Sequence, residues 1–189
     1  MKKNNKLFLL TLLTAIAIHP LKAQQNPSEV RNKYFVGYSF GIPYEKETRD
    51  LSKNSNTIQV GKNFSLNNLL AIGPIVSYNH LTKGRESSIK NNSLNLGVNV
   101  ALYPKYLADL IMGNDYDAYN DKLFITLDLQ KTLNNSEFIF VHNINVNITE
   151  LRIWNNLHLA PNIGFQYFIG EKDSNRSLGF YTIGTKFLF

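Results

Sequence analysis

Hydrophobic and polar residues alternate along most of the chain after residue 33. In residues 93–103 leucine and valine occupy the even positions, while Ser, Asn, Gly and Ala occupy the odd positions up to residue 101. Residues 34–42 and 123–130 repeat this two-residue period, with a mostly small or polar face opposite an apolar one. A period of two is that of a β-strand, whereas the apolar residues of a surface helix recur every three or four positions. The pattern predicts an all-β fold.

Eight such runs follow one another, separated by polar, turn-prone segments. Each holds roughly nine to thirteen residues, about the length of a tilted strand that crosses a membrane. The segments between them predict hairpin connections and mark no second domain. We therefore expect an eight-stranded antiparallel up-and-down transmembrane β-barrel. Its predicted strands are 34–42, 56–64, 70–81, 93–103, 123–130, 138–148, 155–168 and 178–189.

One segment, residues 106–120, interrupts the alternation. Leu107, Leu110 and Ile111 recur there at helical spacing, and acidic and tyrosine residues follow them. A plug or an interfacial helix is one interpretation. An elaborated turn without a specific role is the simpler one, and we prefer it.

The composition of the polar face indicates whether the apolar face lines the interior of the barrel or faces lipid. A soluble barrel buries its apolar face, whereas a membrane barrel turns that face to lipid. The polar face here is rich in Gly, Asn, Ser and Thr and poor in charge, which suits a narrow, hydrogen-bonded lumen better than a water-facing surface. Aromatic residues near the strand ends suit two membrane interfaces. These residues are Tyr34, Phe64, Tyr78, Tyr103, Phe138, Tyr167 and Phe189.

The first 23 residues have the pattern of an export signal. Lys2, Lys3 and Lys6 precede an apolar stretch over 7–18, which is shorter than the ~20 residues of a spanning helix. The small residue Ala23 predicts cleavage before Gln24. The domain plan is then a signal peptide at 1–23, a short segment at 24–32 and the barrel at 33–189.

The net charge of the protein depends largely on that leader. The chain has 20 Lys and Arg residues against 14 Asp and Glu, a formal charge of +6. Four of the bases and none of the acids lie in residues 1–23, so the remainder carries only +2. This weak excess argues against nucleic-acid binding. The absence of cysteine excludes a disulfide framework, a thiolate metal site, a cysteine nucleophile and a lipid-anchoring cysteine.

The last strand resembles a known sorting signal. Residues 181–189 end in phenylalanine and are similar to the C-terminal assembly signal of bacterial outer-membrane barrels. Tyr181, Ile183, Phe187 and Phe189 fill that pattern, and Thr185 is its weak position. Residues 71–78 and 159–168 are similar to strands of the small outer-membrane β-barrel domains common in Bacteroidota.

The resemblance implies a small, porin-like outer-membrane barrel of the kind found in OmpX and the OmpA membrane domain. It further implies insertion by the barrel-assembly machinery, contact with outer-membrane lipids and lipopolysaccharide, and a monomer. The interior of an eight-stranded barrel is filled by its own side chains, so a diffusion pore is not expected.

Within the lumen we expect a polar network of seven residues. These are Asn95, Asn99, Asp128, Asn143, Asn145, His158 and Asn162. Asp128 and His158 are also the weak catalytic candidates, because an Asp–His pair beside Ser77 or Ser93 could activate a hydroxyl for acyl transfer. The simpler interpretation, which we prefer, is a buried carboxylate held by imidazole and amide neighbours. A register slip of one residue near 138–168 would exchange the faces and remove His158 from the lumen.

The sequence offers little support for a cofactor or metal site. The sequence has no phosphate-binding glycine loop and no His-Glu-x-x-His motif, so we expect no cofactor and no metal. Asp115 and Asp117, with Asn114 and Asn120, form the one acidic cluster, but they lack the ordered spacing of a calcium loop.

The sequence thus favours a non-enzymatic outer-membrane barrel with a structural or surface-interaction role. Specificity would reside in the loops that follow odd-numbered strands, at 43–55, 82–92, 133–137 and 170–177, which an even strand count places outside the cell. Two alternatives stay open. One is an enzyme that modifies lipid A or phospholipid, and the other is a soluble periplasmic, lipocalin-like barrel that binds an apolar ligand.

Overall fold

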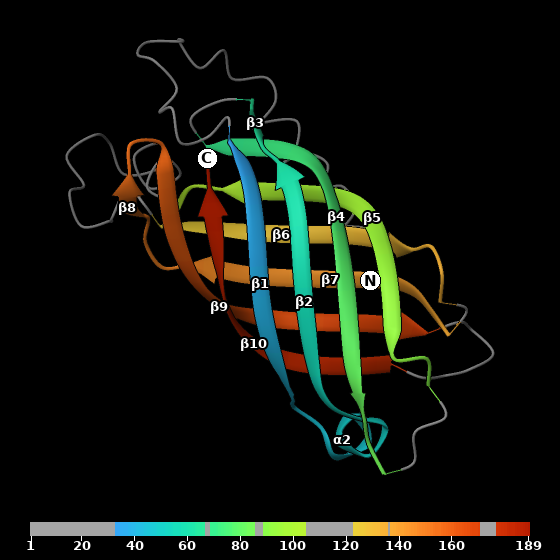
Figure 1. Cartoon of the computed structure of the whole chain (residues 1–189). Coiled ribbons are helices and arrows are strands. Elements are labelled where there is room, and N and C mark those ends of the chain that lie inside the picture. Colours follow the sequence, from blue (N-terminus) through green and yellow to red (C-terminus); the bar gives the residue numbers. More distant parts are fainter. Residues whose placement is uncertain (1–32, 67–68, 86–88, 105–122, 136, 171–176) are drawn as a thin grey trace, which may run out of the picture.

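Eight long antiparallel strands close into a barrel (Figure 1). The computed structural model describes residues 33–66, 69–85, 89–104, 123–135, 137–170 and 177–189. Each long strand pairs with its neighbours along the chain, and β1 pairs with β10 to complete the ring. The predicted all-β, up-and-down fold is confirmed. The strands are β1 (Tyr34–Pro43), β2 (Ser52–Lys62), β4 (Leu70–Lys83), β5 (Asn92–Leu102), β6 (Phe124–Thr132), β7 (Phe138–Asn147), β9 (Leu157–Gly170) and β10 (Ser177–Leu188).

The barrel has two distinct ends. Strand β1 begins and β10 ends at one of them, the terminal end, where the short strands β3 (Phe64–Ser65) and β8 (Leu151–Trp154) extend the wall. The other end carries the helix α2 (Lys46–Leu51) and is called the α2 end (Figure 1). No helix within the described ranges is long and apolar enough to cross a membrane. The predicted signal peptide, the 24–32 segment and the 106–120 segment lie outside the described residues.

The two faces of the wall are those that the sequence pattern predicts. In β5 the side chains of Asn95 and Asn99 are buried inside the barrel, while Leu96 and Val98 are exposed on its outer surface. The same alternation runs through the other long strands, and His142 lies half-buried on the outer face of β7, as expected. From residue 140 to residue 168 the strands keep the expected register, and the slip of one residue does not occur.

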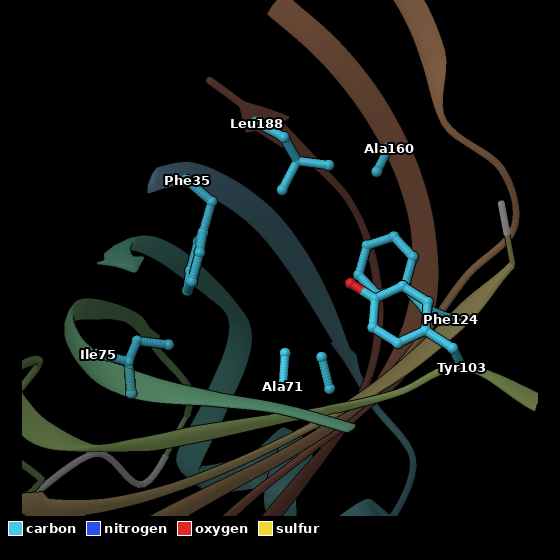
Figure 2. Packing of buried hydrophobic residues seen from close by; sticks show 8 residues of the cluster. Phe35, Ala71, Ile75, Tyr103, Phe124, Ala160 and Leu188 are labelled. Carbon is cyan, nitrogen blue, oxygen red and sulfur yellow. The ribbon is translucent and has the colours of Figure 1, made fainter. Parts of the chain in front are cut away.

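An apolar layer fills the terminal end of the lumen (Figure 2). The ring of Phe35 packs against Gly61 of the neighbouring strand, where an added Cβ atom would overlap the ring. The absence of a side chain at Gly61 thus allows a full phenyl ring inside a narrow barrel. The terminal layer consists of Phe35, Ala71, Ile75, Ala101, Tyr103, Phe124, Ala160 and Leu188.

A second apolar layer fills the α2 end. Leu51, the last residue of α2, packs against it, and the backbone N–H of Gly179 donates a hydrogen bond to the buried hydroxyl oxygen of Thr48 at 3.2 Å. The sequence pattern predicted a polar, turn-prone connection over residues 43–55. Instead, Thr48 and Leu51 lie on one side of a short helix that folds against the barrel, and β2 begins at Ser52. This layer consists of Leu81, Ile89, Phe138, Val141, Phe168, Leu178 and Phe180.

Two aromatic residues assigned to the membrane interfaces lie inside the barrel instead. Tyr103 has the same odd-numbered parity as Asn95 and Asn99, so it points into the terminal layer, where it stacks on Phe124. A register irregularity between Phe138 and Phe140 turns Phe138 inward although Phe140 points outward. The expected interface positions of Tyr103 and Phe138 were therefore wrong.

Both strand prolines lie where a ladder is interrupted, as expected of residues without an N–H. Pro74 lies between Ile75, which pairs with β2, and Ile72, which pairs with β3. Pro161 lies one residue beyond the end of the β7–β9 ladder. Closure of the barrel therefore survives two residues that cannot donate to a strand partner.

Lys62, a charged residue on the outer face of β2, lies at the end of its strand, where charge is tolerated. Its ammonium group lies 3.2 Å from the Tyr34 hydroxyl oxygen at the terminal end and above the rings of Tyr34 and Phe64. The charge therefore sits at the rim of the apolar surface, where a long side chain can reach polar surroundings.

We predict that Phe35→Ala destabilises the barrel far more than Phe64→Ala. Phe35 is 0% exposed in the terminal layer, so its removal leaves a cavity and lowers the free energy of unfolding by about 3–5 kcal/mol. Phe64, at the same end but 46% exposed, should cost at most about 1 kcal/mol. Urea unfolding of both variants in detergent micelles measures the difference. Equal losses would show that the terminal layer is not a packed core.

Candidate functional site

The middle of the lumen, between the two apolar layers, is polar and is the best candidate site in the described residues. Its side chains are mostly amides and hydroxyls that face inward from several strands. Six of the seven predicted network residues lie buried on this inner face. These are Asn95, Asn99, Asp128, Asn143, Asn145 and Asn162.

Two glutamines that the sequence analysis did not single out link strands that are not neighbours. Gln166 on β9 accepts a hydrogen bond from Ser55 at 2.6 Å and donates to Thr57 and Asn79, at 3.0 and 3.1 Å, from the other side of the β1–β10 seam. Gln130 on β6 accepts from Ser77 on β4 at 2.5 Å, passing over β5. Buried amides need partners, and here each partner also ties two parts of the wall together.

A charge cluster lies next to this amide network, on the side of the terminal layer. The Asp128 carboxylate accepts hydrogen bonds from the side-chain amides of Asn99 and Asn143, the latter at 3.3 Å. The Lys186 ammonium group donates to Thr126 at 3.0 Å, attracts the Asp128 carboxylate and lies 4.9 Å from the centre of the Phe35 ring. The single buried acid of the network is thus held by two amides and faces a buried cation, an arrangement that lowers the cost of placing charge inside.

Lys186 was not predicted from the sequence, although a signal for it existed. Lys186 lies between the outward residues Thr185 and Phe187, so strand alternation places it on the inner face. A lysine on that face is expensive unless an anion is near. Asp128, already assigned to the same face, is that anion.

His158 is placed differently from the prediction. Its Nδ1 atom lies 3.5 Å from a carboxylate oxygen of Glu150 at the terminal end, and its side chain is 17% exposed. Asp128 is bound by Asn99 and Asn143 instead, so His158 lies beside Glu150 and not beside Asp128 as expected. The reason is that β9 extends to the rim, where it meets the link between β7 and β8 that carries Glu150.

The candidate serines also have partners other than histidine. Ser77 donates to Gln130, and Ser93 accepts from Asn79 at 3.4 Å and Asn95 at 3.5 Å. A hydroxyl nucleophile needs an adjacent base to remove its proton. The arrangement of these amides and hydroxyls supports hydrogen bonding across the lumen rather than acyl transfer.

Metal binding finds no support in the described part of the chain. Within those ranges no group of three or more His, Asp or Glu side chains is arranged to hold an ion. Asp115, Asp117 and their asparagine neighbours lie outside the described residues.

At the α2 end an aromatic cluster lies on the outer surface. Tyr44 packs edge-on against Phe165 and Tyr181, with ring centres 5.2 and 6.0 Å apart. Its hydroxyl is hydrogen-bonded to Glu45, which raises the pKa of Tyr44 to about 12. Tyr44 therefore stays neutral at physiological pH and offers a ring with a polar tip, a form suited to an apolar–aqueous boundary.

The residues of the resemblance to the assembly signal all point away from the lumen. Tyr181, Ile183, Phe187 and Phe189 are exposed along the outer face of β10 and the residue that follows it. Their side chains are thus accessible from outside the barrel wall.

We predict that Asp128 and Lys186 are energetically coupled. Either Asp128→Asn or Lys186→Met removes one of two opposite buried charges, so each single variant should lower the free energy of unfolding. The double variant should lose less than the sum of the single losses. A double-mutant cycle from urea unfolding measures the coupling, with Lys62→Met at the exposed rim as the control. Strictly additive losses would show that the two groups do not interact.

Comparisons with known proteins find similarity in structure alone. No protein-family model matches the sequence, and no curated protein sequence matches it significantly. A de novo designed transmembrane β-barrel has 15% identity, with 88% of this chain and 99% of that chain covered and a TM-score of 0.42. The Yersinia pestis outer-membrane protein Ail has 10% identity, with 84% and 99% covered and a TM-score of 0.40. The KdgM porin has 10% identity, with 82% and 99% covered and a TM-score of 0.32.

Proposed function

We propose that this protein is an integral outer-membrane β-barrel with a structural or surface-interaction role. One observation carries the proposal: the barrel turns an apolar face outward and a polar face inward. The exposed outer face includes Val36, Val60, Leu96, Val98, Ile144 and Ile183 on five different strands. In water such a continuous surface would cause aggregation, whereas in a bilayer it meets acyl chains.

The soluble-barrel alternative requires the opposite arrangement. A lipocalin-like protein binds an apolar ligand with an apolar interior. Here the interior positions of β5 hold Asn95 and Asn99, and the leucine and valine side chains face outward. This orientation does not favour a soluble carrier.

The enzyme alternative also lacks support. The two candidates, Asp128 and His158, have separate partners, and Ser77 and Ser93 are bonded to amides. A small-solute channel fits the lumen poorly, because an apolar layer fills each end of it. A filled and internally bonded lumen supports a scaffold whose specificity lies outside the barrel.

The α2 end supports the surface-interaction part of the proposal. It carries the four connections that the sequence assigned to the cell exterior, including the one that contains α2. Lys46, Arg49 and Lys53 are surface residues of this connection and could contact lipopolysaccharide phosphates.

The route to the membrane belongs to the same proposal. Export would use the signal peptide at 1–23, with cleavage between Ala23 and Gln24. The barrel-assembly machinery would then read the outward residues of β10. A monomer is sufficient, because closure of the ring leaves no free sheet edge in the barrel wall.

Membrane integration is tested on the protein in alkaline-washed outer membranes. We expect the protein to stay with the membranes and to change its gel mobility when it is boiled in detergent, because a closed barrel resists unfolding until heated. A loosely bound soluble protein would wash off. Release by the wash, or identical mobility before and after boiling, would overturn the proposal.

A further inference from the structure

A two-stranded hairpin extends the wall beyond the barrel at the terminal end (Figure 1). The ladder between β7 and β9 ends at Asn147 and Asn162, and β8 then pairs along the same edge of β9. Unlike the alternating residues of the long strands, all four residues of β8 are exposed. Three of them are large and apolar: Leu151, Ile153 and Trp154, the last of which is 73% exposed.

The strand register makes this hairpin continuous with the outer apolar face. Leu151 pairs with Leu159, which pairs with Phe187 of β10. Phe187 pairs in turn with Val36 of β1, and Val36 with Val60 of β2. A single row of apolar residues therefore crosses five strands and ends on β8.

The next row marks the rim of that surface. His158 pairs with Leu188, so the next residues toward the rim, Leu157 and Phe189, lie at the same level. Trp154 pairs with Leu157 and therefore lies level with Phe189. Phe189 stacks on Tyr34, with ring centres 6.3 Å apart, and Tyr34 pairs with Lys62. Exposed aromatic rings beside a lysine are the composition of a membrane–water interface.

We propose that the β8–β9 hairpin is an interfacial membrane anchor, with Trp154, Ile153 and Leu151 seated at the headgroup–acyl boundary of the leaflet at the terminal end. Arg152, although exposed, pairs with His158 on the opposite face of the hairpin and is not part of this apolar surface. The proposal rests on the membrane insertion proposed above. Lipid is the partner of the hairpin because its apolar residues continue the rows that face lipid in the barrel.

The chain provides its own probe, since Trp154 is its single tryptophan. The folded protein is inserted into phosphatidylcholine vesicles whose lipids carry bromine either near the headgroup or near the chain end. We expect Trp154 emission to shift to shorter wavelength than in urea, and shallow bromine to quench it more than deep bromine. In the matched control, which combines Trp154→Phe with Val98→Trp, the tryptophan lies on the mid-wall outer face, and deep bromine should quench it more.

Gel mobility of the same vesicle samples separates the two proposals. If boiling shifts the band but Trp154 emits as it does in urea, is quenched by aqueous iodide and is unaffected by either bromolipid, the barrel is inserted and the anchor is overturned. If the band does not shift, membrane insertion fails, and the anchor fails with it.

Discussion

Pairing of β1 with β10 is the constraint on which the remaining structure depends. Nine residue pairs from Phe35–Leu188 to Pro43–Phe180 join the first strand to the last, and mutual backbone hydrogen bonds of 2.9 Å between Tyr34 and Phe189 seal the rim. Once the ring is closed, the eight long strands have no free edge, and every second residue must enter a narrow lumen. What the lumen can hold then decides which side chains the strands can carry.

The lumen meets this constraint by sorting its side chains into layers. Apolar groups occupy both ends, where α2 and the strand ends cover them, and polar groups occupy the middle. Amides suit the middle because each one both donates and accepts, so Gln166 can bond Ser55 and Asn79 at once. In the described middle of the lumen, the charged side chains are Asp128 and Lys186, and amides complete the hydrogen bonds of Asp128. The polar side chains of the interior thus bond mainly to one another, which is why the proposed role lies at the surface of the barrel.

Alternation made the strands and both faces predictable, because burial in a closed sheet follows residue parity. The same alternation also places Tyr103 and Lys186 inside the barrel, although neither inward position was predicted from the sequence. It could not show the inward turn of Phe138, which depends on a register irregularity between β7 and β9. Nor could it show that His158 meets Glu150, or that Gln166 reaches Thr57. Those contacts join residues distant in sequence, and they depend on strand stagger and on the extension of β9 to the rim.

The central claim is that the outer face meets lipid, and a pair of arginine substitutions on β5 tests it most directly. Val98, near the middle of the strand, and Leu102, at its end, lie on the same face with nearly equal exposure, 41% and 40%. Unfolding free energies are measured for Val98→Arg and Leu102→Arg in lipid vesicles. The account predicts a loss of about 2–4 kcal/mol for Val98→Arg and about 0–1 kcal/mol for Leu102→Arg, because the cost of charge grows toward the bilayer centre. Equal, small losses at both positions would mean that this face meets water and would contradict the account.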